Sequence, residues 1–305
     1  MRGVVILRAP VALPSGPQSH TESRCRTFPA ETRGYVAVTI GRMKDTPPRP
    51  MLVLLPGLDG TGKLFTDFIR ALGTGVESRV IGYSAEEPLG YEELELQVRA
   101  ALPRDRPYVL LGESFSGPIA MRIAASAPAR LAGVILCGTF ASNPYPWLAW
   151  ARPFAFLLPI KSLPRWVRAP LMWGSKNPRR APGNAERAIA SVASGVVRRR
   201  IAALLAVDAV ESLNRIAIPA LVMYGRRDRV VPNATTRSLI AHLPGAAVAD
   251  IDGPHLLLQA CPAECSAAVL RFMTGPQVLS RCAPQHFRGN AGGAAPPGSL
   301  SEFLP

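Results

Sequence analysis

The stretch Tyr108-Val-Leu-Leu-Gly-Glu-Ser-Phe-Ser-Gly-Pro-Ile-Ala-Met-Arg-Ile-Ala124 joins a short apolar run to an amphipathic segment. The valine and leucines after Tyr108 are typical of a buried strand, and the isoleucines and alanines near its end recur at helical spacing. Ser114 therefore falls on the turn between a predicted strand and a predicted helix. Small residues at Gly112 and Gly117 allow strand and helix to approach closely, so that a sharp turn can strain the backbone of the serine.

The segment Gly112-Glu-Ser-Phe-Ser116 resembles the G-x-S-x-G nucleophile elbow of the α/β-hydrolase superfamily, with Ser116 in place of the final glycine. Serine is among the smallest substitutes for glycine, so we expect the packing of the helix to survive the exchange. The departure leaves a second interpretation open, in which Ser114 is an incidental residue of a tight turn. The elbow therefore needs support from other parts of the chain.

Apolar runs and helical patterns alternate through the middle of the chain. The predicted strands are residues 35–40, 51–55, 79–83, 108–111, 131–137, 217–224 and 247–251. Such alternation indicates an α/β protein with a mostly parallel sheet and helices on both faces. The resemblance implies the α/β-hydrolase fold, with a core formed by residues 34–142 and 215–274.

Residues 143–214 interrupt this alternation and contain every tryptophan of the chain. An insertion at this point resembles the helical cap that covers the active site of many α/β hydrolases. Its aromatic residues have two interpretations, packing of the cap on the core or contact with the acyl group of a substrate. We expect Trp147, Trp150 and Phe154 to contact the substrate.

The two ends of the chain differ in composition from the middle. Residues 1–33 mix proline, serine, arginine and glycine without a period, and residues 275–305 drift into glycine, alanine and proline. Segments of this composition bury too little apolar surface to fold alone, so we predict that both are disordered.

The loop after the strand at 51–55 carries a second motif. Gly57-Leu-Asp-Gly-Thr-Gly-Lys-Leu64 fits G-x-x-x-x-G-K, but Leu64 stands where a phosphate-binding P-loop needs serine or threonine for Mg²⁺. The resemblance implies instead an oxyanion loop, with the backbone N–H groups of Leu58 and Phe115 as donors. A P-loop-like nucleotide-binding protein stays as an alternative from another class.

Asp228 and His255 each follow a predicted strand and resemble the acid and histidine loops of the family. With Ser114 they occur in the order Ser, Asp, His, which is the hydrolase order, and parallel sheets place their sites beyond such strand ends. The chemistry implied is proton removal from Ser114 by His255, whose tautomer and charge Asp228 stabilises. It requires no cofactor and no metal.

The resemblance within the superfamily is to small bacterial-type serine esterases and lipase-like hydrolases that carry a Leu-Pro-Gly-Leu-Asp-Gly loop. It implies cleavage of a carboxylic ester, or a thioester, of an apolar acyl group through an acyl-enzyme. Two alternatives stay open: an acyltransferase that uses the same three side chains, and a non-catalytic binding protein on a hydrolase scaffold.

The formal net charge is +14, which ordinarily suggests nucleic acid or an anionic membrane as a partner. Lysine is rare, however, and the excess of arginine, alanine and proline indicates compositional bias. We interpret the dense cluster Arg198-Arg-Arg200 as a solvated helix face. We therefore expect a small-molecule acyl ester as the partner and no nucleic acid; the sequence leaves the oligomeric state open.

Five scattered cysteines argue against a disulfide framework and favour a reducing compartment. Cys261 and Cys265 are one helical turn apart, but no second pair completes a tetrahedral zinc site, so no metal is expected. No stretch reaches the roughly 20 apolar residues that span a bilayer, so we expect no stable membrane insertion. The predicted location is the cytoplasm.

Overall fold

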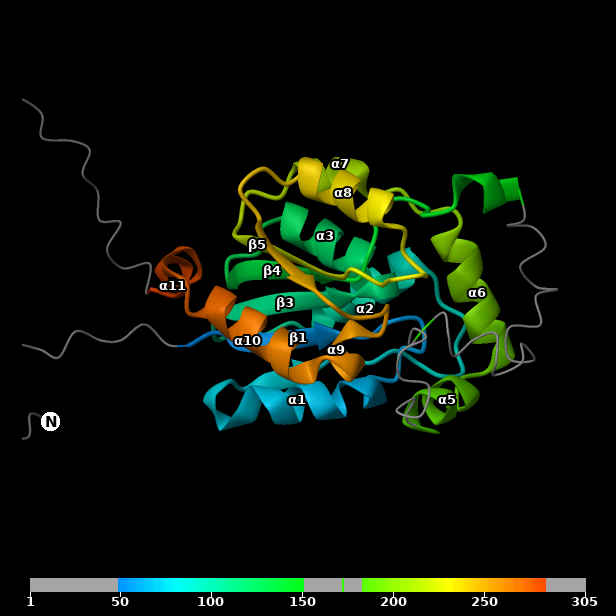
Figure 1. Ribbon diagram of the computed structural model, residues 1–305, viewed down its shortest axis with the longest axis horizontal. Helices are drawn as coiled ribbons and strands as arrows, with labels where there is room; N and C mark the ends of the chain where they lie inside the picture. Colours follow the sequence, from blue (N-terminus) through cyan, green and yellow to red (C-terminus); the bar gives the residue numbers. More distant parts are fainter. Residues whose placement is uncertain (1–48, 151–171, 173–182, 284–305) are drawn as a thin grey trace, which may run out of the picture. The chain divides into compact units, whose positions relative to one another are not determined.

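The computed structural model describes residues 49–150, 172 and 183–283 (Figure 1). The strand expected at 35–40, the segment 1–33 and Phe154 lie outside the described residues. None of the helices within the described ranges has both the length and the apolar character that crossing a membrane requires.

The centre of the fold is a six-stranded sheet in the order β2-β1-β3-β4-β5-β6, and every neighbouring pair is parallel. The strands are β1 (Met51–Leu55), β2 (Ser78–Val80), β3 (Tyr108–Glu113), β4 (Leu131–Cys137), β5 (Ala220–Gly225) and β6 (Ala247–Ile251). The parallel sheet confirms the predicted fold class. Because β1 pairs with both β2 and β3, the chain reverses its direction of travel across the sheet after β2. The loops after β1 and β3 therefore diverge at their carboxyl ends, where parallel sheets form binding crevices.

Helices cover both faces of this sheet (Figure 1). The α-helices are α1 (Thr66–Leu72), α2 (Tyr91–Ala101), α3 (Gly117–Ala125), α5 (Gly183–Ala190), α6 (Ser194–Leu204), α7 (Val210–Asn214), α8 (Asn233–Ala241), α9 (Leu257–Ala260), α10 (Pro262–Met273) and α11 (Pro276–Cys282). The short 3₁₀ helices are η1 (Lys63–Phe65), η2 (Gly73–Gly75) and η3 (Ser114–Ser116).

Alternate residues of the central strands pack against opposite helical layers. In β1, Val53 and Leu55 join the core cluster that includes α2, α3, α7 and α8, whereas Leu52 and Leu54 join the cluster formed with α1, α10 and α11. All residues of β1, β3 and β4 are buried. This explains why their sequences are continuous apolar runs and not alternating ones.

Helix α11 corrects the predicted extent of the C-terminal tail. We expected disorder from residue 275, but Pro276–Cys282 form a helix, and Val278 and Cys282 are buried in the cluster with α10. The two side chains are four residues apart, so they lie on one face of the helix. That face adds enough apolar contact to extend the folded part of the chain to Cys282.

The segment between β4 and β5 leaves the sheet and returns to nearly the same place. Ser142 and Asp208 form an antiparallel bridge, and the N–H of Ala209 donates to the carbonyl of Ala141 at 2.8 Å. We call residues 143–207 the β4–β5 insertion. Figure 1 shows its helices α5 and α6 beyond the carboxyl ends of the strands.

Helix α7 falls within the range predicted for the cap but packs with the core. Its residue Leu213 is buried in the same cluster as Ile119 and Ile123 of α3. Helix α7 contacts α3, and Figure 1 shows it on the face of the sheet that α3 covers. The bridge between Ser142 and Asp208 therefore marks the boundary of the insertion. The helical pattern that continues to residue 214 does not mark it.

Candidate active site

Ser114 lies at the end of β3 with a backbone φ of 48°, a left-handed conformation that is rare for a residue with a side chain. The two glycines around it are required by packing. A Cβ on Gly112 would lie 2.8 Å from the Cβ of Ala120, and a Cβ on Gly117 would lie 1.9 Å from Thr139 Oγ1. The close approach of β3, α3 and the residues after β4 therefore forces the sharp turn that carries the serine.

Ser116, which replaces the usual glycine, has a bonding role of its own. It is fully buried, and its hydroxyl donates to the carbonyl of Pro56. The Tyr83 hydroxyl lies 2.5 Å from the same Ser116 oxygen. Burial raises the pKa of Tyr83, so that its hydroxyl stays protonated and can donate to Ser116. The exchange of glycine for serine thus ties the turn to the loop after β1.

The structure brings Ser114, His255 and Asp228 into one line of hydrogen bonds. Ser114 Oγ lies 3.0 Å from His255 Nε2, and His255 Nδ1 lies 2.8 Å from Asp228 Oδ2. The other carboxylate oxygen, Oδ1, accepts the N–H groups of Val230 at 2.7 Å and Val231 at 2.9 Å. The side chains of His255 and Asp228 are only 5% and 4% exposed, so the carboxylate is held in a fixed position away from solvent.

The loop after β1 passes beside Ser114. A Cβ on Gly57 would lie 3.8 Å from the Cβ of Ser114, and Leu58 and Phe115 line the same cavity as the serine. Lys63, the lysine of the P-loop-like motif, is exposed to solvent. The Gly57–Gly60 loop therefore lies beside the serine, and an oxyanion role for the N–H groups of Leu58 and Phe115 stays a prediction.

Arg200 corrects the interpretation of the arginine cluster as a solvated face. Its side chain, on α6, is fully buried. Nη1 donates to the carbonyls of Leu58 and Asp59, both at 2.9 Å, and Nη2 donates to the carbonyl of Ser84 at 2.8 Å. Its position three and four residues after two buried valines of α6 places it on their side of the helix, a signal that the sequence already contained.

Glu113 is a second buried charged group that sequence reasoning missed. Gln259 Nε2 donates to its Oε1 at 2.9 Å. The pKa of this carboxyl is raised to about 7, mainly by burial and also by the nearby Asp59, while hydrogen bonds from Gln259 and the Gly57 backbone oppose the rise. A glutamate between a strand and a nucleophile turn gave no sequence signal of burial.

An apolar cavity of about 380 Å³ opens beside Ser114 and His255. Its lining comes from the sheet loops and the β4–β5 insertion, and includes Leu58, Leu64, Phe115, Phe140, Tyr145, Met172, Ile189, Val197, Leu204 and Val231. Trp147 and Trp150 are not among the lining residues and are 69% and 70% exposed. The structure therefore gives no support to the expectation that these two tryptophans contact a substrate. Tyr145 lines the cavity instead, and its hydroxyl donates to the carbonyl of Val230 at 2.7 Å.

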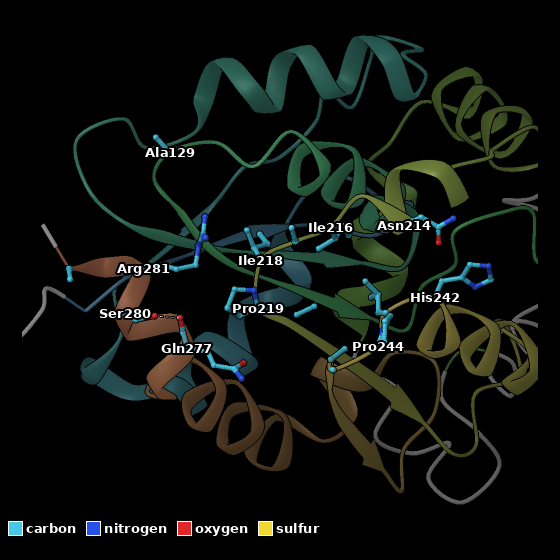
Figure 2. A pocket seen from close by; sticks show the side chains of 16 residues that line it. Ala129, Asn214, Ile216, Ile218, Pro219, His242, Pro244, Gln277, Ser280 and Arg281 are labelled. Carbon is cyan, nitrogen blue, oxygen red and sulfur yellow. Dashed lines mark hydrogen bonds between the residues drawn. The ribbon is translucent and has the colours of Figure 1, made fainter. Parts of the chain in front are cut away.

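A larger hollow of about 1090 Å³ lies elsewhere (Figure 2). Pro219 precedes β5, and Ala129 precedes β4, so the hollow sits at the amino ends of these strands. Its lining includes His242 and Arg281 but none of the residues around Ser114. The smaller cavity is therefore the one that meets the strained serine.

Several solved structures share the fold of this chain. The enol-lactonase from Burkholderia xenovorans LB400 is 20% identical, with a TM-score of 0.65 over 74% of this chain and 92% of that chain. A hydrolase from Pseudomonas aeruginosa PA01 is 23% identical, with a TM-score of 0.62 over 74% and 91%. At these identities the likeness establishes the fold.

Curated relatives resemble the chain over most of their length. The "Putative carbamate hydrolase RutD" of Rhizobium rhizogenes is 27% identical over 75% of this chain and 94% of its own length. The protein of the same name from Caulobacter sp. is 28% identical over 74% and 91%. The family described as "Serine aminopeptidase, S33" matches residues 92–253, which include Ser114 and Asp228. Because this match spans more than half of the chain, the protein belongs to the serine aminopeptidase S33 family of α/β hydrolases.

Proposed function

We propose that the protein is a serine hydrolase that cleaves a carboxylic ester, or a thioester, of an apolar acyl group. The observation that supports this most directly is the hydrogen-bonded line from Ser114 through His255 to Asp228. It ends at an apolar cavity. A serine hydroxyl is a weak nucleophile at neutral pH, and an adjacent imidazole is the group that activates it.

The proposed reaction has two halves. His255 Nε2 takes the proton of Ser114 as Oγ attacks the acyl carbon, and Asp228 stabilises the imidazolium that forms. The N–H groups of Leu58 and Phe115 stabilise the oxyanion, each worth on the order of 3 kcal/mol in comparable sites. His255 then gives the proton to the leaving alcohol or thiol. Water attacks the acyl-enzyme by the same route and releases the acid.

The cavity favours an acyl group over the free amino terminus of a peptide. An aminopeptidase needs an anionic group for the substrate ammonium. The carboxylates among the described lining residues, Asp59 and Glu113, are already bonded to Thr61 and Gln259. The rest of the lining is mainly apolar, which suits a hydrocarbon chain.

Carbamate cleavage is the second candidate, because the curated relatives carry that name. With the same three side chains, Ser114 Oγ can attack a carbamate carbonyl in the geometry in which it would attack an ester carbonyl. The two candidates differ in what surrounds the carbonyl, since a small polar carbamate gains little from an apolar cavity.

We also propose that the β4–β5 insertion acts as a cap, because Ile189, Val197 and Leu204 line the cavity.

The test combines labelling with turnover. The protein is incubated with a fluorophosphonate probe, the labelled peptide is mapped, and kcat/KM is compared for p-nitrophenyl butyrate and for a small alkyl carbamate. Label on Ser114 with higher kcat/KM for the ester is the expected result. Label on Ser114 with higher kcat/KM for the carbamate selects the second candidate. The absence of both labelling and turnover would favour a non-catalytic binding protein. Formation of a new ester when an alcohol is added would identify an acyltransferase.

A further inference from the structure

Arg200 makes an unusual set of contacts for a buried cation. Its three hydrogen bonds among the described residues all go to backbone carbonyls, those of Leu58, Asp59 and Ser84. The guanidinium carbon also lies 5.5 Å from the centre of the Tyr83 ring. Burying a charge is costly unless it is well bonded, so these carbonyls and the aromatic ring must offset the lost hydration.

Two of the three carbonyls belong to the loop that runs beside Ser114. The loop has internal support, because the N–H of Gly60 donates to the carbonyl of Gly57 at 3.0 Å and Tyr83 N–H donates to the carbonyl of Gly60 at 2.7 Å. The peptide planes that follow Leu58 and Asp59 are held from α6. Arg200 Nη1 bridges both carbonyls, and a Cβ on Gly60 would lie 2.4 Å from that nitrogen.

A guanidinium is suited to this task because its donors lie in one rigid plane. Two carbonyls bonded to a single Nη1 are fixed relative to each other, which fixes the backbone conformation between them. Oxyanion donors act through such preorganisation, since they must point at the developing charge before the reaction begins. In a loop that is free to rotate, the N–H groups can point toward water instead.

We propose that Arg200 is a positioning residue, through which α6 holds the Gly57–Gly60 loop so that the N–H of Leu58 faces the oxyanion. The inference rests on the proposed function, because it gives that N–H its role. It makes the β4–β5 insertion part of the catalytic apparatus as well as a wall of the cavity. Arg200 itself touches no reacting atom.

The test uses the full chain with Arg200→Lys and Arg200→Ala. The control is Arg199→Ala on the same helix, because Arg199 is 46% exposed and lies 3.6 Å from Glu93 at the surface. The steady-state constants for p-nitrophenyl butyrate are measured for each variant. Amide hydrogen exchange of residues 57–61 is followed in the same proteins, because it reports on the loop whether or not any ester is cleaved.

We expect Arg200→Ala to lower kcat by about 10- to 100-fold, less than the ~10²–10³ that loss of a whole oxyanion donor produces. KM should change less than threefold, and the loop amides should exchange faster. Arg200→Lys, which keeps the charge on a single donor nitrogen but lacks the planar guanidinium, should fall between Arg200→Ala and wild type. Added guanidinium should restore part of the activity of Arg200→Ala and none in the Arg199→Ala control.

Unchanged kcat and unchanged exchange in both Arg200 variants would overturn the proposal. So would unfolding of both variants, since Arg200 would then serve the fold and not the loop. A wild-type protein without Ser114 labelling refutes the proposed function instead. In that case faster amide exchange of residues 57–61 in the Arg200 variants would still show that Arg200 holds the loop. Unchanged exchange would show that it does not.

Discussion

Ser114 and Ser116 are separated by one residue, but their hydroxyls face different surroundings. Ser114 Oγ lies against His255, and Ser116 Oγ is buried against Pro56 and Tyr83. We predict that Ser114→Ala abolishes fluorophosphonate labelling and ester hydrolysis with little change in the free energy of unfolding. Mass spectrometry of the labelled protein and urea denaturation measure the two effects. Undiminished turnover in Ser114→Ala would contradict the assignment.

Ser116→Ala is the matched control for that experiment. It should keep the label on Ser114, while the loss of a buried hydrogen-bonding hydroxyl should lower the free energy of unfolding by about 1–3 kcal/mol. Label that moves from one serine to the other, or that disappears only in Ser116→Ala, would reverse the two roles.

Glu113 makes stability depend on pH in a defined window. Its pKa is about 7 in the folded protein against a usual 4.5, so between these values the folded state holds a proton that the unfolded state has lost. Rising pH therefore lowers the free energy of unfolding through this window, by on the order of 3 kcal/mol. We predict that Glu113→Gln removes this slope.

The measurement is urea denaturation of wild type and Glu113→Gln at several pH values between 4.5 and 8. Glu92→Gln, an exposed glutamate of α2, is the control and should keep the wild-type slope. Parallel curves for wild type and Glu113→Gln would show that the buried carboxyl does not titrate in this range.

Asp228 has a partner on each carboxylate oxygen, so the amide oxygen of Asp228→Asn can still accept the N–H of Val230, while the amide nitrogen takes the place of the oxygen that faces His255. We predict that Asp228→Asn lowers kcat by up to ~10⁴, because an amide favours the wrong tautomer of His255. Asp252→Asn, whose side chain pairs at the surface with Arg227, should keep kcat within a factor of about two. A loss of less than tenfold in Asp228→Asn would assign the orienting role to another residue.

At the scale of elements, the sequence predicts best where one physical rule acts alone. The buried strands β1 and β4 have the predicted bounds, because continuous apolar runs have few other structures available. Helix α11 escaped prediction because its apolar face consists of few residues in a polar, proline-containing context. Only the surface it meets, α10 and β4, shows that those residues suffice.

The contribution of α11 can be measured directly. Val278 is 1% exposed, so Val278→Ala should lower the free energy of unfolding by roughly 2 kcal/mol, because it removes two buried methyl groups from the core. Gln277→Ala, at the exposed neighbouring position, should change it by less than about 0.5 kcal/mol. Equal effects in chemical denaturation would mean that the helix adds nothing to the core.

At the scale of the whole molecule, the order of three residues along the chain and their positions after strands were enough to predict that their side chains meet. Ser114, Asp228 and His255 each follow a strand, and parallel strands place their carboxyl ends at one edge. Their catalytic roles stay predictions. The cavity wall was less predictable, because the direction in which Trp147 or Arg200 points depends on how the insertion lies on the core and not on local pattern.

Acyl-chain preference tests that wall. If hydrocarbon fills the cavity, kcat/KM for p-nitrophenyl esters should rise from acetate to butyrate by about fourfold per methylene, equivalent to ~0.8 kcal/mol. It should stay above the acetate value for octanoate. Val197→Phe, which narrows the cavity, should reduce the ratio of octanoate to acetate, while Trp147→Ala should leave it unchanged. A steady fall from acetate to octanoate would indicate a short-chain or polar substrate.

The bridge between Ser142 and Asp208 has a consequence for how such a protein can diversify. Because the insertion leaves and re-enters the core at adjacent points, segments of other lengths can be spliced there while β4 and β5 keep their register. Selectivity can then be exchanged as a module without moving the nucleophile. The one constraint on a graft is inherited from the loop beside Ser114: its carbonyls at Leu58 and Asp59 need a donor, and a module without an arginine in the place of Arg200 must supply another.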